Sequence, residues 1–152
     1  MNLNCVLGFT STEVVLLDFD DTDLDLVIQY ARKAMKLFDL GGFLVLESSR
    51  CCFHVVFNRW VDWRENMKVV AWAILRSHNL GLSRWQLMQC RKGSSTLRVS
   101  EKYWVESSPP WIVYGEGEHD EGIDDYLFYR DLLRCAHKHK MEERASASAY
   151  AA

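Results

Sequence analysis

Two aspartates separated by one residue stand at the end of an apolar run near the N-terminus. The run Val-Val-Leu-Leu at 14–17 leads directly into Asp18, Phe19 and Asp20. Side chains alternate between the faces of a strand, so in a strand over 14–20 the two carboxylates point to the same face. Paired carboxylates suit hard divalent cations, and we expect Asp18 and Asp20 to bind Mg²⁺ or Mn²⁺. In the alternative interpretation, the acids from Asp20 onward only cap the following helix.

A second group of polar side chains lies just before and within a strand expected over 52–57. Ser48, Ser49 and Arg50 fall in a turn, and His54 falls on the strand. His54 alternates with apolar neighbours, so it faces the acids if those neighbours pack against helices. Hydroxyl, guanidinium and imidazole groups near a metal suit a triphosphate. We therefore predict that these four residues bind nucleotide and that His54 joins the acid pair as a catalytic residue. The alternative is a partly buried histidine beside a solvated turn.

The apolar pattern predicts the elements that position these groups. Apolar residues recur every three or four positions over 24–38 and 62–80, which indicates two amphipathic helices. Residues 43–57 leave no room for a helix and are typical of two antiparallel strands joined by a short turn. The resulting β-α-β-β-α-β order predicts an α+β domain with a ferredoxin-like or RRM-like core, a mostly antiparallel sheet and helices on one face. Its first and third strands are neighbours, which places the acids beside His54.

The rest of the chain is expected to extend this core within one domain over residues 1–143. The predicted elements are strands at 85–90 and 96–100 around a polar turn at 91–95, an edge strand at 111–114, an acidic loop at 115–122 and a helix at 123–140. The small, repetitive residues 144–152 are predicted to be a disordered tail or a cloning remnant.

Taken in order, these groups resemble motifs of the archaeo-eukaryotic primase superfamily. Asp18-Phe19-Asp20 is similar to its acid-x-acid motif, and Cys52-Phe53-His54 is similar to its small-x-His motif. The later stretch 95–102, which contains Arg98, resembles the family's Leu-Arg-bearing strand. The resemblance covers residues 14–102 and is that of a minimal, divergent member.

This resemblance implies a primase-polymerase-like nucleotidyltransferase that binds a metal–nucleoside triphosphate and a DNA or RNA template. It implies that Asp18 and Asp20 hold the metal and that Arg98 and Lys102 line the nucleotide or template side. A helicase or a larger replication subunit is an expected partner. The family usually has a third metal-binding acid; none stands on the expected strand at 87–91, and Glu101 or the loop 116–121 are examples of residues that could supply it from elsewhere. Without a third acid, catalysis would be weakened or lost.

The same residues also resemble the first motif of haloacid dehalogenase-like phosphatases. In that interpretation Asp18 is the nucleophile, Asp20 the acid/base and Ser48 the phosphate-binding hydroxyl. Lys92 would be the lysine of that site, and residues 115–120 would be its acidic loop. That fold requires parallel strands separated by helices, which residues 43–57 do not allow.

A third interpretation is a non-catalytic nucleic-acid-binding module. Its basic residues would include Arg91 and Lys92, which lie in the predicted turn between two strands, together with Arg50, Arg98 and Lys102. A fourth, a rolling-circle nicking enzyme, requires a His-x-His metal pair. The histidines at 137–139 are better explained as part of a basic helix end.

Composition limits the possible partners and compartment. The net charge of −3 gives no global nucleic-acid signature, so any such surface is local. The five cysteines contain no CxxC pair, which favours a reducing, cytoplasmic compartment. No apolar run approaches the roughly 18 residues of a membrane span, and no membrane partner is expected.

Overall fold

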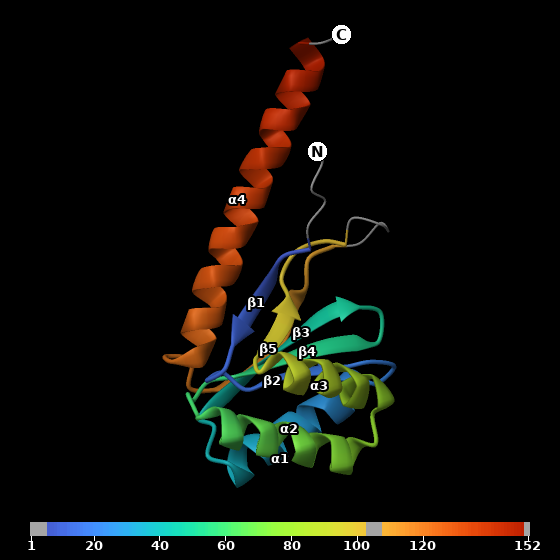
Figure 1. Cartoon of the computed structure of the whole chain (residues 1–152), viewed down its shortest axis with the longest axis vertical. Coiled ribbons are helices and arrows are strands. Elements are labelled where there is room, and N and C mark those ends of the chain that lie inside the picture. The colour runs from blue at the N-terminus through green and yellow to red at the C-terminus, as the bar shows by residue number, and fades with distance from the viewer. Residues whose placement is uncertain (1–5, 103–107, 151–152) are drawn as a thin grey trace.

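The computed structural model describes residues 6–102 and 108–150 (Figure 1). Its elements, in chain order, are β1 (Gly8–Ser11), β2 (Leu16–Phe19), α1 (Leu24–Leu37), β3 (Gly42–Ser49), β4 (Cys52–Phe57), α2 (Trp63–Ser77), α3 (Leu80–Lys92), β5 (Ser95–Arg98), β6 (Trp111–Gly117) and α4 (Gly122–Tyr150).

The main sheet has the order β2-β4-β3-β6, and every neighbouring pair is antiparallel. β4 lies between β2 and β3, so the first and third strands of the predicted pattern are neighbours. This confirms an α+β fold with a ferredoxin-like core. β6 forms the edge next to β3 and extends to Gly117, through part of the predicted acidic loop.

Helices α1 and α2 cover one face of this sheet. The residues that point toward them alternate along the strands, for example Leu17 and Phe19 on β2 and Phe53, Val55 and Phe57 on β4. They form one apolar cluster with the buried stripes of the two helices. The N-cap residue of α2 is Asp62, whose carboxylate accepts a hydrogen bond from the Glu65 amide at 2.8 Å, as the capping-box spacing predicts.

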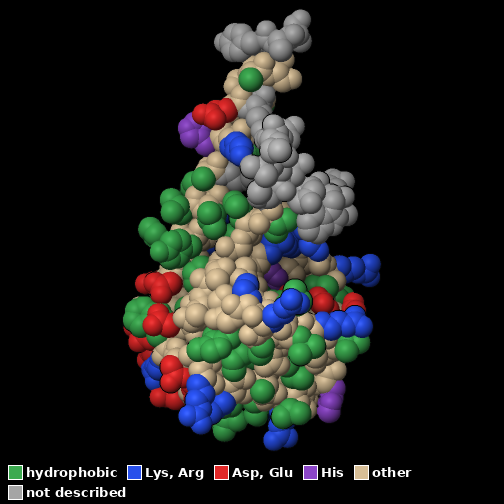
Figure 2. Space-filling view, in the orientation of Figure 1, with side chains coloured by type: hydrophobic (Ala, Val, Ile, Leu, Met, Phe, Trp, Pro, Cys, Tyr) green, Lys and Arg blue, Asp and Glu red, His purple; other side chains and the backbone are tan. Residues whose placement is uncertain are grey.

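The opposite face is covered by β1, β5 and the first part of α4. Leu16 and Val56 belong to a second cluster, together with Leu97 of β5 and Ile123 and Tyr126 of α4. The prediction of helices on one face therefore describes α1 and α2, whereas α4 packs on the other. The far half of α4 runs well beyond the sheet (Figure 1), and residues 145–149 are helical rather than an irregular tail. Hydrophobic side chains remain exposed along α4 (Figure 2), including Phe128, Leu132 and Met141.

One predicted strand is wrong, and another forms but lies outside the main sheet. Residues 85–90 are not a strand but part of α3, whose first turn is capped by the Asn79 side chain and whose C-cap is Gly93 in the left-handed region. The predicted strand at 96–100 forms as Ser95–Arg98. It pairs with β1 in a separate two-stranded sheet instead of joining the main one.

Among the described residues, no helix combines the length and the apolar character needed to span a bilayer. In the same part of the chain, Cys51, Cys52, Cys90 and Cys135 are free thiols.

Candidate functional site

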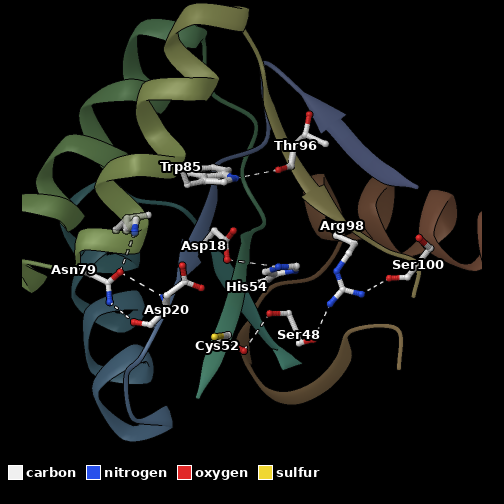
Figure 3. Close-up of polar contacts among 11 residues, drawn as sticks. Asp18, Asp20, Ser48, Cys52, His54, Asn79, Trp85, Thr96, Arg98 and Ser100 are labelled. Atoms are coloured by element: carbon white, nitrogen blue, oxygen red, sulfur yellow. Dashed lines mark hydrogen bonds and ion pairs between the residues drawn. The ribbon is translucent and has the colours of Figure 1, made fainter. Parts of the chain in front are cut away.

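Asp18 and His54 face each other across two neighbouring strands. Their Cα positions are register partners in the β2–β4 ladder, so both side chains emerge on the face away from α1 and α2. Nε2 of His54 lies 3.6 Å from Oδ1 of Asp18 (Figure 3). The Asp18 side chain is 25% exposed and the His54 side chain only 4% exposed. The Asp18 carboxyl is therefore partly accessible from solvent, whereas His54 is almost completely covered.

Burial sets the protonation of this pair. Burial, with the like charge of Asp20, raises the pKa of Asp18 to about 7 against the opposing charges of Arg98 and Lys102. Burial, followed by the charges of Arg98 and Lys102, lowers the pKa of His54 to about 3. Between these values the carboxyl is protonated and the imidazole is neutral, so their contact is polar and not an ion pair. Nδ1 of His54 is buried without a hydrogen-bond partner.

Asp20 follows the end of β2 and lies against the start of α3. The Asn79 amide donates to the Asp20 carbonyl at 2.7 Å, and the Asp20 amide faces Asn79 Oδ1 at 3.4 Å. A Cβ at Gly81 would lie 2.4 Å from Asp20 Oδ2, so the carboxylate packs against the first turn of the helix. Asn79 and Gly81 are missed by the sequence analysis because the predicted strand at 85–90 hides this helix start. An asparagine followed by helical apolar spacing was the available signal.

Arg98 crosses from β5 to the β3–β4 hairpin. Its guanidinium donates to the carbonyl of Ser48 at 2.7 Å and also to the carbonyls of Ser100 and Ser108. The Ser48 hydroxyl is turned back to the carbonyl of Cys52 at 3.3 Å. These two predicted nucleotide ligands are therefore occupied by contacts within the chain. Arg98 acts on the pair through its charge and holds the hairpin end in place.

The remaining predicted residues are spread around this centre. Ser49 ends β3, and Arg50 is exposed in the following turn. Lys102 is close enough to shift the pKa values of Asp18 and His54. Arg91 and Lys92 lie in the last turn of α3 rather than in a turn between strands, and Lys92 donates to the Thr96 hydroxyl.

The acidic loop does not complete the site. Glu116 binds Arg32, Asp120 accepts from Asn58, and Glu121 accepts from the Trp60 amide. β6, which carries the start of this loop, is separated from β2 by β4 and β3. Residues 116–121 are therefore excluded as the source of a third acid next to Asp18.

Two carboxylates, those of Asp18 and Asp20, are available at this site to hold a metal ion. Within residues 6–102 and 108–150, no group of three or more His, Cys, Asp or Glu side chains is placed to hold a metal ion. Mg²⁺ is commonly bound by one or two carboxylates, with water and substrate phosphates completing its shell. Asp18, which is partly exposed, and Asp20, which is exposed, fit that kind of shared site and do not fit a metal site built from the protein alone.

Comparisons with protein-family models, curated proteins and solved structures find no match. The functional argument below therefore rests on the residues and geometry of this chain.

Proposed function

We propose that this domain binds a metal–nucleoside triphosphate and a DNA or RNA template as a primase-polymerase-like nucleotidyltransferase. The observation that carries the proposal is the register pairing of Asp18 with His54 on the split β-α-β sheet, with Asp20 at the end of the same strand. This places on neighbouring strands the residues of the two motifs that resemble the primase superfamily.

In this proposal Asp18 and Asp20 hold Mg²⁺ or Mn²⁺ together with the triphosphate. The metal would neutralise phosphate charge during phosphoryl transfer. Lys102 supplies positive charge near Asp18, and the exposed Arg50 follows β3 in the turn before β4. His54 is nearly sealed from solvent, so we assign it the positioning of Asp18 in place of the direct phosphate contact that the sequence predicts. With only two carboxylates, we expect transfer to be slow.

One assay separates the candidate activities. The protein is incubated with a template, labelled nucleotides and Mn²⁺ or Mg²⁺, and in parallel with a generic phosphatase substrate. We expect template-dependent extension that disappears in Asp18→Asn. The control Asp21→Asn should keep it, because Asp21 is exposed and has φ 48°, which asparagine tolerates. Phosphate release without extension would favour the phosphatase, which the antiparallel sheet already disfavours. Nucleic-acid binding with neither activity would favour a non-catalytic module.

The role of His54 has its own test. If His54 positions Asp18, His54→Gln should weaken metal-dependent triphosphate binding, measured by titration calorimetry, while metal-free binding stays unchanged. The pH dependence of metal binding should shift at the same time, because the environment of Asp18 changes. Equal losses of triphosphate and monophosphate affinity, with an unchanged pH profile, would show that His54 only supports the fold.

A further inference from the structure

Helices α1 and α2 pack side by side on the main sheet and border a groove (Figure 1). The groove has a volume of about 760 Å³, which is within the usual range for ligand sites. Its wall is formed by six side chains, namely Tyr30, Lys33, Lys36 and Leu37 of α1 and Trp72 and Arg76 of α2. The wall therefore combines two aromatic rings with three cations, and it contains no acidic residue.

The cations of the groove are accessible to a ligand. Lys33, Lys36 and Arg76 are exposed, and none of them forms a salt bridge with another described residue. The acid nearest in effect is Glu116, which binds Arg32 and responds to Lys36 only through its charge. Together α1 and α2 contain six lysine or arginine residues and two acidic ones, although the whole chain has a net charge of −3. The two helices thus form a local basic surface, which attracts polyanions.

The helix dipole explains only part of this charge pattern. Lys36 and Arg76 lie in the last turns of their helices, where a cation is favourable in any helix. That effect does not account for Lys33, or for the two aromatic rings in the same wall. A ligand that needs both cations and rings accounts for all of them.

The two rings are held in place from the protein interior. Tyr30 stacks on the buried Phe19 at a centroid distance of 6.3 Å and an interplanar angle of 14°. Trp72 meets Phe38 edge to face at 6.0 Å. Both rings remain partly exposed and line the groove, so these contacts orient them without covering them. Oriented aromatic rings next to cations are the combination with which proteins stack unpaired bases and hold the phosphates that join them.

Positive charge continues along α2 beyond the groove. Lys68 precedes Trp72 by four residues and Arg76 follows it by four, so the three side chains share one side of the helix. Successive positions at this spacing are about 6 Å apart along the helix axis. Lys68 pairs with Glu65 at 3.0 Å, but both side chains are partly exposed, and such a pair competes weakly with a phosphate. A row of cations suits a ligand with repeated phosphates better than one with a single phosphate.

We propose that the groove between α1 and α2 binds single-stranded nucleic acid. Its bases stack on Tyr30 and Trp72, and its phosphates pair with Lys33, Lys36 and Arg76. A duplex keeps its bases paired and stacked on one another, so it cannot offer them to the rings. The groove lies on the opposite side of the sheet from Asp18 and His54, so this inference goes beyond the proposed function and does not rest on it.

Fluorescence anisotropy in EDTA tests this inference without a metal ion. The probe is a dye-labelled oligothymidine of about ten nucleotides, which is within the usual site size of single-strand-binding proteins. The competitors are the corresponding duplex, an abasic oligomer of the same length and a polyglutamate peptide of the same length. We expect the single strand to bind most tightly. Equal binding of the abasic oligomer would overturn the inference, because only charge would be recognised. Tighter binding of polyglutamate would overturn it in favour of an acidic protein partner.

The cations are tested together. The combined variant Lys33→Gln, Lys36→Gln and Arg76→Gln should weaken binding at low salt by about tenfold or more. It should also reduce the slope of log affinity against log salt by about 2, because three phosphate contacts are lost. The control Arg84→Gln, Lys138→Gln and Lys140→Gln removes the same charge from exposed positions outside the groove and should leave the slope unchanged. Equal slopes for the two variants would overturn the inference.

The rings are tested by substitution and by tryptophan fluorescence. Trp72→Leu should weaken strand binding about five- to hundredfold, which is the usual effect of losing one stacked base. It should also remove most of the quenching of tryptophan fluorescence by the strand. The control Trp60→Leu changes an exposed tryptophan outside the groove and should keep both affinity and quenching. Trp72 also packs against Phe38, so circular dichroism must first show that Trp72→Leu is folded. A folded variant with unchanged affinity and quenching would contradict base stacking in the groove, and if this variant does not fold, the exposed charge variants decide.

These outcomes are distinguishable from a failure of the proposed function. Strand binding that the groove variants lose and Asp18→Asn keeps, without template-dependent extension by the wild type, supports the groove and contradicts the polymerase activity. Strand binding that the groove variants keep and Lys102→Gln weakens would overturn the groove and favour binding at the candidate site. Extension by the wild type with no metal-free strand binding would contradict the groove alone.

Discussion

The two faces of the main sheet are built differently. The face under α1 and α2 is lined by an uninterrupted apolar cluster that includes Leu17, Phe43 and Phe57. The face under β1, β5 and α4 mixes apolar residues with Asp18 and His54. Most of the buried polar atoms without a hydrogen-bond partner in the described residues belong to the second face, namely His54 Nδ1, Ser95 Oγ, Tyr126 Oη and Arg130 Nε, whereas Asn66 Oδ1 belongs to α2. One face stabilises the fold, and the other keeps polar groups whose burial opposes folding.

The largest expected effect on the free energy of unfolding comes from a substitution in the apolar core under α1 and α2. Phe57 is completely buried and packs against Phe43 at a centroid distance of 6.2 Å. Phe57→Ala should lower the free energy of unfolding by about 3–5 kcal/mol, because it removes buried surface and leaves a cavity. Urea denaturation measures the loss. A change below about 1 kcal/mol would mean that this face tolerates cavities and that the contrast between the faces is weaker than proposed.

On the face that carries Asp18 and His54, we expect a substitution to raise the free energy of unfolding and not to lower it. At pH 8 the Asp18 carboxylate is ionised in both states, and partial burial disfavours its charge in the folded state, as its raised pKa of about 7 shows. Asp18→Asn should therefore raise the free energy of unfolding at this pH by about 1–3 kcal/mol. Denaturation of the variant and of the control Asp21→Asn at pH 8 checks the gain. A loss would show that the Asp18 charge stabilises the fold.

The pH dependence of stability gives a further test of the Asp18–His54 pair on this face. The raised pKa of Asp18 gives stability that is full below about pH 4 and is lost as pH rises toward 7. The lowered pKa of His54 gives stability that is full above about pH 6.5 and is lost as pH falls toward 3. Between about pH 4 and 6.5 both states hold one proton on this pair, on Asp18 when folded and on His54 when unfolded, so its two contributions cancel.

Single substitutions should separate the contributions of Asp18 and His54 to the pH dependence of the free energy of unfolding. In that range, Asp18→Asn should lose up to about 1.4 kcal/mol per unit as pH falls, and His54→Gln should lose a similar amount as pH rises. Denaturant unfolding at half-unit pH intervals measures both slopes. Parallel curves for the two variants would contradict the assignment of the proton to Asp18.

The smallest expected effect on stability comes from Asn79, which connects the end of β2 with the start of α3. Asn79 caps α3 through the Leu82 amide and also holds the main chain of Asp20. Asn79→Ala should cost about 1 kcal/mol of stability, which is the usual value of a cap, and should also weaken Mn²⁺ binding. Asp62→Ala removes the comparable cap of α2 and should lower stability by a similar amount with no effect on Mn²⁺ binding. If Asn79→Ala and Asp62→Ala changed the affinity for Mn²⁺ equally, Asn79 would act only through helix stability.

Much of the first face was predictable. Alternating residues on two strands and helical spacing in α1 and α2 define a split β-α-β sheet, and that topology places Asp18 opposite His54. The strand predicted at 85–90 was wrong because Trp85 and Leu87 alternate with polar residues over a short stretch. The burial of Leu82, Trp85 and Gln89 at helical spacing becomes visible only once α3 packs beside β2.

The second face was not predictable from local pattern. Its cover depends on the pairing of β1 with β5, whose partners are far apart in sequence, and on α4 returning to the sheet. Arg130 is an ordinary charged residue of an amphipathic helix until that return buries it. The contacts of Arg98 with backbone carbonyls likewise follow from tertiary placement, because no residue type or spacing marks a carbonyl as an acceptor.

The β1–β5 ribbon has a consequence for the order of assembly. The hydroxyls of Thr10 and Thr96 meet at 2.7 Å across 86 residues of sequence, so this ribbon closes only after the intervening chain is in place. Closing such a long loop has a high entropy cost, whereas the β3–β4 hairpin is local. The sheet with α1 and α2 can therefore form while its other side is still open to water. If the proposed site on that side binds a ligand, its binding would be coupled to the closing of this ribbon.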